Sequence, residues 1–214
     1  MALHREPVGD ALARWLDTHV MPDGVLAQMY DELGALPDAE MMTHPDLGRF
    51  LRVLVSATRA TRIVEVGTFV GTSAIWMAQA LPADGRLDAL DISEEHSEIA
   101  RDWFARAGLA DRVTLHVAPA SETLARLDGP YDLAYIDADK PGYPRYFDAL
   151  ARLVRPGGIV VADNIFNRGR VAEPPLEGNA RALDAFASGV MADPRFDTTI
   201  LTVGDGISFS VARG

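Results

Sequence analysis

Lys140 is the only lysine of this 214-residue chain, because nineteen of its 20 Lys and Arg residues are arginine. It directly follows an apolar, strand-like run and lies beside the carboxylates of Asp137 and Asp139. Arginine stays protonated in proteins, whereas a lysine can lose its proton where its surroundings disfavour the charge. The position of Lys140 therefore favours a role as a base that gains and loses a proton during a reaction. The alternative is an ordinary solvated surface charge.

Asp163 and Asn164 end a second strand-like run, as Asp137 ends the run before it. If the two strands are neighbours in a parallel sheet, their carboxyl ends meet and three oxygen ligands converge. Two carboxylates and an amide oxygen, with no histidine or cysteine nearby, select a hard cation such as Mg²⁺. Asp-Asn is also a common turn pair, so this indication depends on its combination with Asp137 and Lys140.

A glycine-containing turn follows the first strand-like run, in Val64-Glu65-Val66-Gly67-Thr68-Phe69-Val70-Gly71. Glycines allow a tight turn and a close approach of the backbone to a ligand. The spacing is not G-x-G-x-x-G, so the pyrophosphate cradle of a dinucleotide site is missing. Glu65 would repel a phosphate and suits a cationic ligand. The alternative is a plain strand-to-helix turn.

Asp91 ends the next strand-like run. An acid roughly twenty residues beyond such a glycine turn commonly binds the hydroxyl pair of a ribose. A ligand that is cationic, contains a ribose and lacks a pyrophosphate matches S-adenosylmethionine. The alternative for Asp91 is a surface helix cap.

The elements that must position these residues alternate from residue 62 onward. The predicted strands are 62–67, 87–92, 113–118, 131–138 and 158–164, and the predicted helices are 72–81, 94–107, 121–127 and 143–154. Such alternation indicates βαβ units and a parallel sheet with helices on both faces.

Both ends of the chain depart from this pattern. Segments 196–203 and 207–213 read as strands separated by only three residues, which is too short for a parallel crossover, so they are predicted to form an antiparallel hairpin. The predicted N-terminal helices are 9–19, 24–34 and 46–58. We predict a single domain over 1–214, with a helical cap at 1–58 and a sheet core at 62–214. Segment 173–178 is predicted as a surface loop.

Composition limits the possible partners and chemistry. The chain has no cysteine, which excludes disulfides, thiolate catalysis and zinc–thiolate sites. Its net charge of -11 argues against nucleic acid or an anionic membrane as a partner. No apolar run approaches the ~20 residues of a membrane span. The first residues lack an apolar signal core, so we predict a cytoplasmic protein.

Together these motifs resemble a known family, the cation-dependent class I O-methyltransferases of the caffeoyl-CoA and catechol type. The resemblance covers roughly residues 41–212. Its motifs, in order, are Met41-Met42-Thr43, Val64-Glu65-Val66-Gly67-Thr68, Gly71-Thr72-Ser73, Ala89-Leu90-Asp91-Ile92, Gly108-Leu109-Ala110-Asp111, Ile136-Asp137-Ala138-Asp139-Lys140, Arg155-Pro156-Gly157-Gly158, Asp163-Asn164 and Gly204-Asp205-Gly206. The resemblance implies an α/β, Rossmann-like class I methyltransferase fold. That fold has a seven-stranded, mostly parallel sheet with an inserted antiparallel last strand and helices on both faces, usually in a homodimer.

The resemblance also implies roles for single residues. The implied contacts to S-adenosylmethionine are Met41, Thr43, Glu65, Gly67, Ser73, Asp91, Ala120 and Asp137. The implied ligands of Mg²⁺ or another divalent cation are Asp137, Asp163 and Asn164, and Lys140 is the implied general base, acting beside Asp137. Many relatives have an aromatic residue three positions after the ligand asparagine, where this chain has Asn167; Phe166 can substitute for it.

The predicted activity is S-adenosylmethionine- and Mg²⁺-dependent O-methylation of a small aromatic substrate with two vicinal hydroxyls. Arg168 and Arg170 could meet an acidic substrate or form part of a solvated loop. One alternative is a nicotinamide-dependent oxidoreductase on a similar sheet, against which the missing G-x-G-x-x-G counts. The other is a non-catalytic S-adenosylmethionine-binding protein, against which the metal-ligand set with Lys140 counts.

Overall fold

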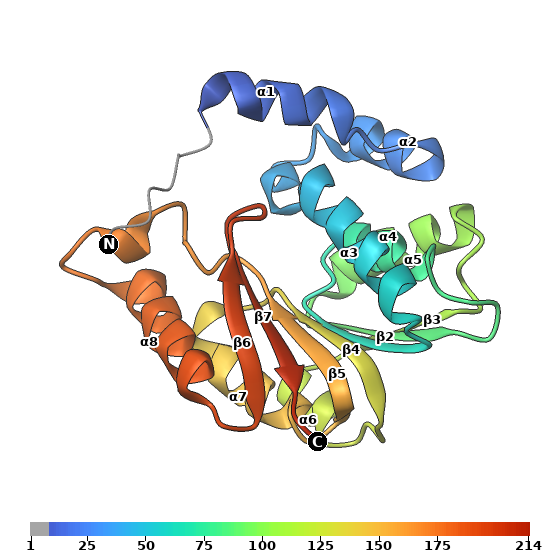
Figure 1. Ribbon diagram of the computed structural model, residues 1–214. Helices are drawn as coiled ribbons and strands as arrows, with labels where there is room; N and C mark the ends of the chain where they lie inside the picture. Colours follow the sequence, from blue (N-terminus) through green and yellow to red (C-terminus); the bar gives the residue numbers. More distant parts are fainter. Residues whose placement is uncertain (1–8) are drawn as a thin grey trace.

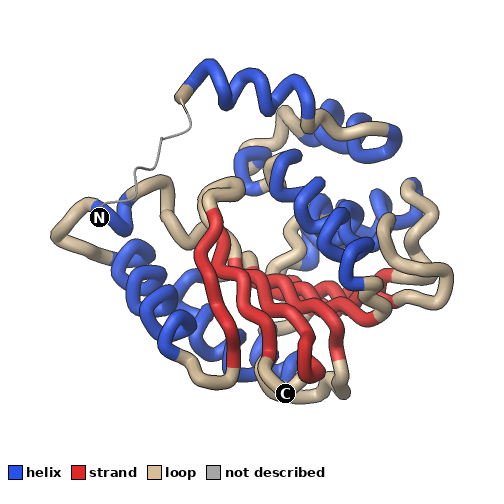
Figure 2. The backbone as a smooth tube through the Cα atoms, viewed as in Figure 1, coloured by secondary structure: helices blue, strands red, loops and turns tan. Residues whose placement is uncertain are grey.

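The computed structural model describes residues 9–214, apart from the side chains at positions 10, 13 and 17. Seven strands form one sheet in the order β3-β2-β1-β4-β5-β7-β6, drawn in Figures 1 and 2. The strands are β1 (Arg62–Val66), β2 (Arg86–Asp91), β3 (Val113–Val117), β4 (Tyr131–Ile136), β5 (Val154–Ala162), β6 (Phe196–Leu201) and β7 (Ile207–Ala212). The α-helices are α1 (Asp10–His19), α2 (Gly24–Leu33), α3 (Pro45–Thr58), α4 (Thr72–Ala78), α5 (Glu94–Arg106), α6 (Ala120–Leu124), α7 (Tyr143–Leu150) and α8 (Gly178–Ala192). Short 3₁₀ helices are η1 (Ala39–Met41), η2 (Lys140–Gly142) and η3 (Arg170–Ala172).

Strand pairing confirms the predicted sheet. Strands β1 to β5 pair in parallel, and β7 pairs antiparallel with both β5 and β6. The last strand is therefore inserted between β5 and β6, and the hairpin expected from the three-residue connection is present. This is the mostly parallel, seven-stranded sheet with an antiparallel last strand that the resemblance implied.

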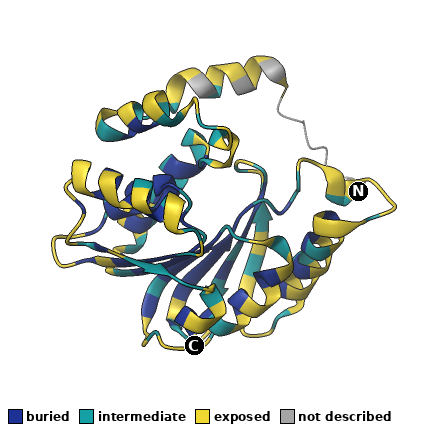
Figure 3. Cartoon of the chain, turned by 180° about the vertical axis from the view of Figure 1, so that it is seen from behind, coloured by how far each residue is buried: buried dark blue, intermediate teal, exposed yellow. Residues whose placement is uncertain are grey.

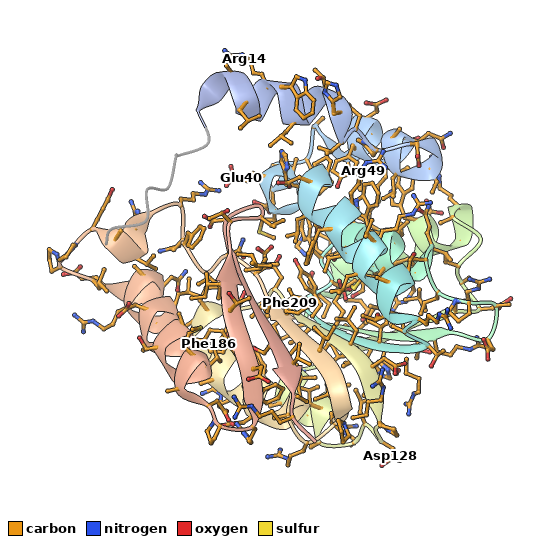
Figure 4. The ribbon with its side chains drawn as sticks, viewed as in Figure 1. Arg14, Glu40, Arg49, Asp128, Phe186 and Phe209 are labelled. Carbon is orange, nitrogen blue, oxygen red and sulfur yellow. The ribbon has the colours of Figure 1, made fainter. Side chains whose placement is uncertain are left out.

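Helices cover both faces of the sheet, because the apolar strand residues alternate between two buried clusters. One cluster joins Ile63 of β1 to residues of α3, α4 and α5. The other joins Val64 of β1 to residues of α6, α7 and α8. Phe209 of β7 packs against the first cluster and Phe186 of α8 belongs to the second; Figure 4 labels both.

Several element boundaries differ from those predicted. Helix α4 ends at Ala78 and α7 at Leu150, both earlier than expected, and β5 begins at Val154 rather than at residue 158. The predicted strand began at Gly158 and so excluded the sequence Pro156-Gly157 before it. Instead this sequence lies within β5, opposite a register irregularity between Tyr131 and Leu133 of β4. Bulges of this kind are where strands tolerate proline and glycine.

Helix α8 was missing from the predicted elements. Its buried residues are Ala180, Leu183, Phe186 and Val190, a spacing that keeps them on one helix face. That periodicity is present in the sequence and could have revealed the helix. The predicted loop at 173–178 does precede it, and most of its residues are exposed.

Helices α1 and α2 lie beyond the sheet on the side toward which β6 points (Figure 1). Helix α1 is mostly exposed along its described part (Figure 3). Arg49 of α3 ties the α1–α2 connection down by donating from Nε to the Val20 carbonyl at 3.0 Å. The signal-peptide argument falls on residues 1–8, which lie outside the described residues. Within residues 9–214, no helix is both long and apolar enough to cross a membrane.

Candidate active site

The carboxyl ends of β1, β4 and β5 bring the predicted site residues to one edge of the sheet. Asp137 N donates to the Val66 carbonyl at 2.8 Å, and Asp163 N donates to the Ile136 carbonyl at 2.9 Å. Chain connections run in opposite directions from β1 and β4, so this edge contains the switch point where open α/β sheets bind ligands. The convergence predicted for Asp137 and Asp163 is therefore present.

Lys140 lies at the centre of this edge. Its ammonium nitrogen donates to Asp137 Oδ1 at 2.9 Å, to Asn164 Oδ1 at 2.5 Å and to the Tyr143 hydroxyl at 2.8 Å. Tyr143 is buried, and its own hydroxyl donates to the Asp163 carbonyl at 3.2 Å. The lysine is therefore held in a fixed position rather than solvated, and Tyr143 is a contact that the sequence prediction missed.

Asp163 is the most buried of the three candidate metal ligands, with only 4% of its surface exposed. Its Oδ1 accepts from the Asn164 backbone N–H at 2.6 Å, and its Oδ2 accepts from the Tyr135 hydroxyl at 3.0 Å. Burial raises the pKa of this carboxyl well above its ordinary value, and the nearby Asp137 charge adds to the rise. A cation at this edge would favour the ionised form.

The chemistry of these oxygens fits a small divalent cation. The Lys140 ammonium already lies between Asp137 Oδ1 and Asn164 Oδ1, so these two atoms converge on a position that suits positive charge. Within the described chain, no three His, Cys, Asp or Glu side chains gather as a metal site. The set here has two carboxylates, and its third donor is an amide. An all-oxygen set of this type suits Mg²⁺ or a similar hard ion.

Glu65 is fully buried in the turn after β1. Its Oε2 accepts from the Thr68 hydroxyl at 2.8 Å, whereas Oε1 has no hydrogen-bond partner among the described residues. Burial raises the pKa of this carboxyl to about 7, and the hydroxyls of Ser73 and Thr68 partly oppose the rise. A buried carboxylate oxygen without a partner fits a positively charged ligand group, as the sequence predicted.

Gly67 lets this turn pack directly against the backbone of Asp137. It has a φ of +92°, and a Cβ there would lie 2.0 Å from the Asp137 carbonyl oxygen, so only glycine fits. Ser73, in the first turn of α4, is buried a few residues further along. The turn thus places Gly67 against the Asp137 backbone and the Ser73 hydroxyl near the Glu65 carboxyl.

Asp91 is tied to the same turn by hydrogen bonds that the sequence did not reveal. Its Oδ2 accepts from the backbone N–H groups of Thr68 at 3.0 Å and Phe69 at 2.7 Å. Its Oδ1 accepts from the Ser93 N–H at 2.8 Å, just before α5. Asp91 therefore holds the glycine turn in shape, and Oδ1, which accepts only one hydrogen bond, keeps a lone pair for a ligand.

We expect Asp91→Ala to raise KM for S-adenosylmethionine more than it lowers kcat. A hydrogen bond to the ribose stabilises the bound cofactor about equally in the ground state and in the transition state. The unfolding free energy should fall by about 1–3 kcal/mol, since the N–H groups of the turn lose their acceptor. Asp88→Ala is the matched control on the same strand, where the carboxylate accepts from His116 and Tyr131. It should lose stability without changing cofactor affinity. Calorimetry showing equal cofactor affinity for Asp91→Ala and wild type would contradict the predicted contact.

The other predicted cofactor residues are Thr43, Met41 and Ala120. The Thr43 carbonyl accepts a hydrogen bond from the Tyr30 hydroxyl, which in turn accepts from Trp76 Nε1 of α4 at 3.2 Å. Thr43 is thereby linked to the helix that follows the glycine turn. Met41 ends η1 with an exposed side chain. Ala120 begins α6, just after Ala118 N donates to the carbonyl of Asp91 at 3.0 Å.

The loop after Asn164 is joined to the β6–β7 hairpin. Phe166 N donates to the Asp205 carbonyl at 2.9 Å, and Asp205 Oδ1 accepts from the Arg168 N–H at 2.8 Å. A Cβ at Gly206 would lie 2.4 Å from the Phe166 ring, so the ring packs over this glycine. Asn164 itself has a φ of +57°, a conformation that asparagine tolerates better than most residues. The hairpin therefore holds the loop that begins at a candidate ligand.

Arg168 and Arg170 are exposed. The Arg168 guanidinium lies 3.6 Å from Glu40 Oε1 of η1, a residue labelled in Figure 4. The exposure of both side chains agrees with the solvated alternative for this loop.

Comparison with known proteins places the chain in a family. The family profile described as "O-methyltransferase" matches residues 17–213. The chain belongs to this family. It is an S-adenosylmethionine-dependent O-methyltransferase, which decides against both the nicotinamide-dependent oxidoreductase and the non-catalytic binding protein.

Individual relatives agree with this assignment. The chain is 34% identical to "Catechol O-methyltransferase" of Mycobacterium tuberculosis (strain ATCC 25618 / H37Rv), over 100% of both chains. It is 35% identical to "Probable caffeoyl-CoA O-methyltransferase 1" of Dictyostelium discoideum, over 78% of this chain and 76% of the relative. Its fold is similar to that of the O-methyltransferase from Bacillus cereus in complex with SAH, with a TM-score of 0.86 and 31% identity, covering 95% and 97% of the two chains.

Proposed function

We propose that this enzyme methylates one oxygen of a catechol-type substrate with the help of a divalent cation such as Mg²⁺. The observation that carries the proposal is the cluster at the ends of β4 and β5. There the Lys140 ammonium lies between the side-chain oxygens of Asp137 and Asn164, next to the buried Asp163. The names of the catechol and caffeoyl-CoA relatives support the substrate class.

Residues of the glycine turn would hold S-adenosylmethionine, which supplies the methyl group. Glu65 offers a buried oxygen without a partner to a positive charge, and Gly67 allows the close packing of this turn against the Asp137 backbone. Asp91 Oδ1 keeps a lone pair that can accept from a ribose hydroxyl, while Oδ2 holds the turn. Met41, Thr43, Ser73 and Ala120 would line the remaining pocket.

Lys140 is the residue that would remove the proton from the substrate hydroxyl. A neutral phenol is a poor nucleophile, with a pKa near 10 for a tyrosine-like hydroxyl. A divalent cation bound to Asp137, Asp163 and Asn164 would act as a Lewis acid and favour the phenolate. Tyr143 and Asp137 orient the Lys140 nitrogen through the contacts described above. Because the base is already held in place, less entropy is lost when it reaches the reactive geometry.

The proposal is tested by a methyl-transfer screen with the wild-type protein. Catechol, caffeate, a caffeoyl thioester and a flavonoid catechol are each incubated with S-adenosylmethionine, in Mg²⁺ and in excess EDTA. At least one of them should gain one methyl group by mass spectrometry in Mg²⁺ and none in EDTA. Full turnover in EDTA would contradict the cation, and failure with every catechol would contradict the substrate class.

We also propose that the enzyme forms a homodimer, as the resemblance implied. Two large apolar side chains of α1 support this, because Leu12 and Trp15 are 49% and 54% exposed. Neighbouring exposed apolar residues often mark a protein–protein contact. Light scattering that gives the mass of a single chain at working concentration would contradict the dimer.

A further inference from the structure

Tyr135 lies within the apolar strand β4, and its side chain is fully buried. Its hydroxyl donates to Asp163 Oδ2 at 3.0 Å. In the sheet register Tyr135 pairs with Glu65 of β1 on one side and with Val161 of β5 on the other. Paired residues share a face of the sheet, and so do residues two apart on one strand. The phenol therefore lies on the Glu65 face and reaches along β5 to the carboxylate two residues beyond Val161.

Asp163 has one described hydrogen-bond donor on each carboxylate oxygen. The Asn164 N–H binds Oδ1 at 2.6 Å, and the Tyr135 hydroxyl binds Oδ2. Rotation of the carboxylate would break one of these bonds, so the pair fixes its plane and the direction of its remaining lone pairs. Because Asp163 is so deeply buried, bulk water does not replace a lost donor.

We propose that Tyr135 is a positioning residue that holds the Asp163 carboxylate in the orientation needed to bind a divalent cation. This inference rests on the proposed function, because it takes Asp163 as a metal ligand. Tyr135 acts through Asp163 and not on the substrate. Hydrogen-bond partners of ligating carboxylates orient the ligand, and their loss typically weakens metal affinity about 10–100-fold.

Tyr131 provides a matched control on the same strand. It is buried like Tyr135, and its hydroxyl donates to a carboxylate, Asp88 Oδ2, at 2.8 Å. Tyr131→Phe and Tyr135→Phe therefore each remove one tyrosine–carboxylate hydrogen bond from β4. Only Tyr135→Phe removes a bond to a candidate metal ligand.

The test is Mn²⁺ binding to the full-length protein, measured from the electron paramagnetic resonance signal of free Mn²⁺. Tyr135→Phe should raise the Kd for Mn²⁺ about 10–100-fold. Tyr131→Phe should stay within a few-fold of wild type, and calorimetry should show unchanged S-adenosylmethionine affinity in both variants. Equal Mn²⁺ affinity in Tyr135→Phe and wild type would overturn the role of Tyr135 alone. Failure of the wild type to bind Mn²⁺ would overturn the proposed metal site, and this inference with it.

A second measurement needs no substitution at Tyr135. In wild-type protein with ring-labelled tyrosine, saturating Mg²⁺ should shift the nuclear magnetic resonance signal of Tyr135 and leave that of Tyr131 in place. The signals of the other four tyrosines are identified by their disappearance in Tyr30→Phe, Tyr131→Phe, Tyr143→Phe and Tyr146→Phe, and the remaining signal belongs to Tyr135. An unshifted Tyr135 signal in protein that binds Mg²⁺ would overturn the inference even if Tyr135→Phe failed to fold.

Discussion

Lys140→Arg is expected to lower the methyl-transfer rate by about 10²–10⁴-fold, the range that general-base catalysis typically contributes. Arginine keeps the positive charge but does not release its proton near neutral pH. Its planar guanidinium also fits poorly where a compact ammonium meets oxygens of Asp137, Asn164 and Tyr143 within 2.9 Å. Single-turnover rates at neutral pH measure the loss, and calorimetry should show that S-adenosylmethionine still binds.

Arg145→Lys is the control for this substitution. Arg145 is exposed on α7, five positions after Lys140, and the reverse exchange there should leave the rate unchanged. A Lys140→Arg rate within a few-fold of wild type would remove Lys140 from the role of base.

Asp163→Ala is expected to abolish the metal-dependent reaction. The variant loses one of three oxygen ligands, so the cation binds weakly and the substrate hydroxyl stays protonated. EDTA should reduce the wild-type rate to that of the variant, and added Mg²⁺ should restore the wild type only. The exposed Asp184 of α8 gives a control, because Asp184→Ala removes a carboxylate that is not a candidate ligand. Activity of Asp163→Ala in EDTA equal to that of wild type in Mg²⁺ would refute the metal assignment.

The pH dependence of stability tests whether the buried Asp163 carboxyl gains and loses a proton in the folded protein. Burial raises the pKa of the Asp163 carboxyl in the folded protein, so the folded state binds this proton more tightly than the unfolded state. The unfolding free energy in EDTA should therefore decrease as the pH rises from about 4, the ordinary value, through the raised pKa. Asp163→Asn has an amide that does not titrate in this range, so its unfolding free energy should lack the part of the decrease that comes from Asp163. An identical pH dependence in the two proteins would contradict the buried, titrating carboxyl.

The sequence predicted the sheet edge well because its residues stand at strand ends. Asp137 and Asp163 each follow an apolar run, and parallel strands place such positions side by side. The hairpin of β6 and β7 followed from a connection too short for any other pairing. Lys140 was singled out because it is the only lysine and because it stands beside Asp137 and Asp139 in the sequence.

Contacts between side chains distant in sequence were not predictable in this way. Tyr135 stands in an apolar strand and reads as an ordinary core residue, yet it binds Asp163, 28 positions later. The bonds from Asp91 to the glycine turn likewise span 22 and 23 positions. Such bonds depend on register and side-chain direction, which strand periodicity does not specify. The missed helix α8 is different, since its pattern was present in the sequence.

The most direct test of the central claim compares two substrates that differ by one hydroxyl. Asp137, Asp163 and Asn164 supply only three ligands, which leaves room for two adjacent oxygens in an octahedral Mg²⁺ shell. A monophenol can fill only one such position and keeps rotational freedom, so it loses both activation and orientation. We therefore predict Mg²⁺-dependent methylation of caffeate with little or none of para-coumarate, or the same contrast in any matched pair that the enzyme accepts. Comparable kcat/KM for the two members would show that chelation of a vicinal diol does not position the substrate.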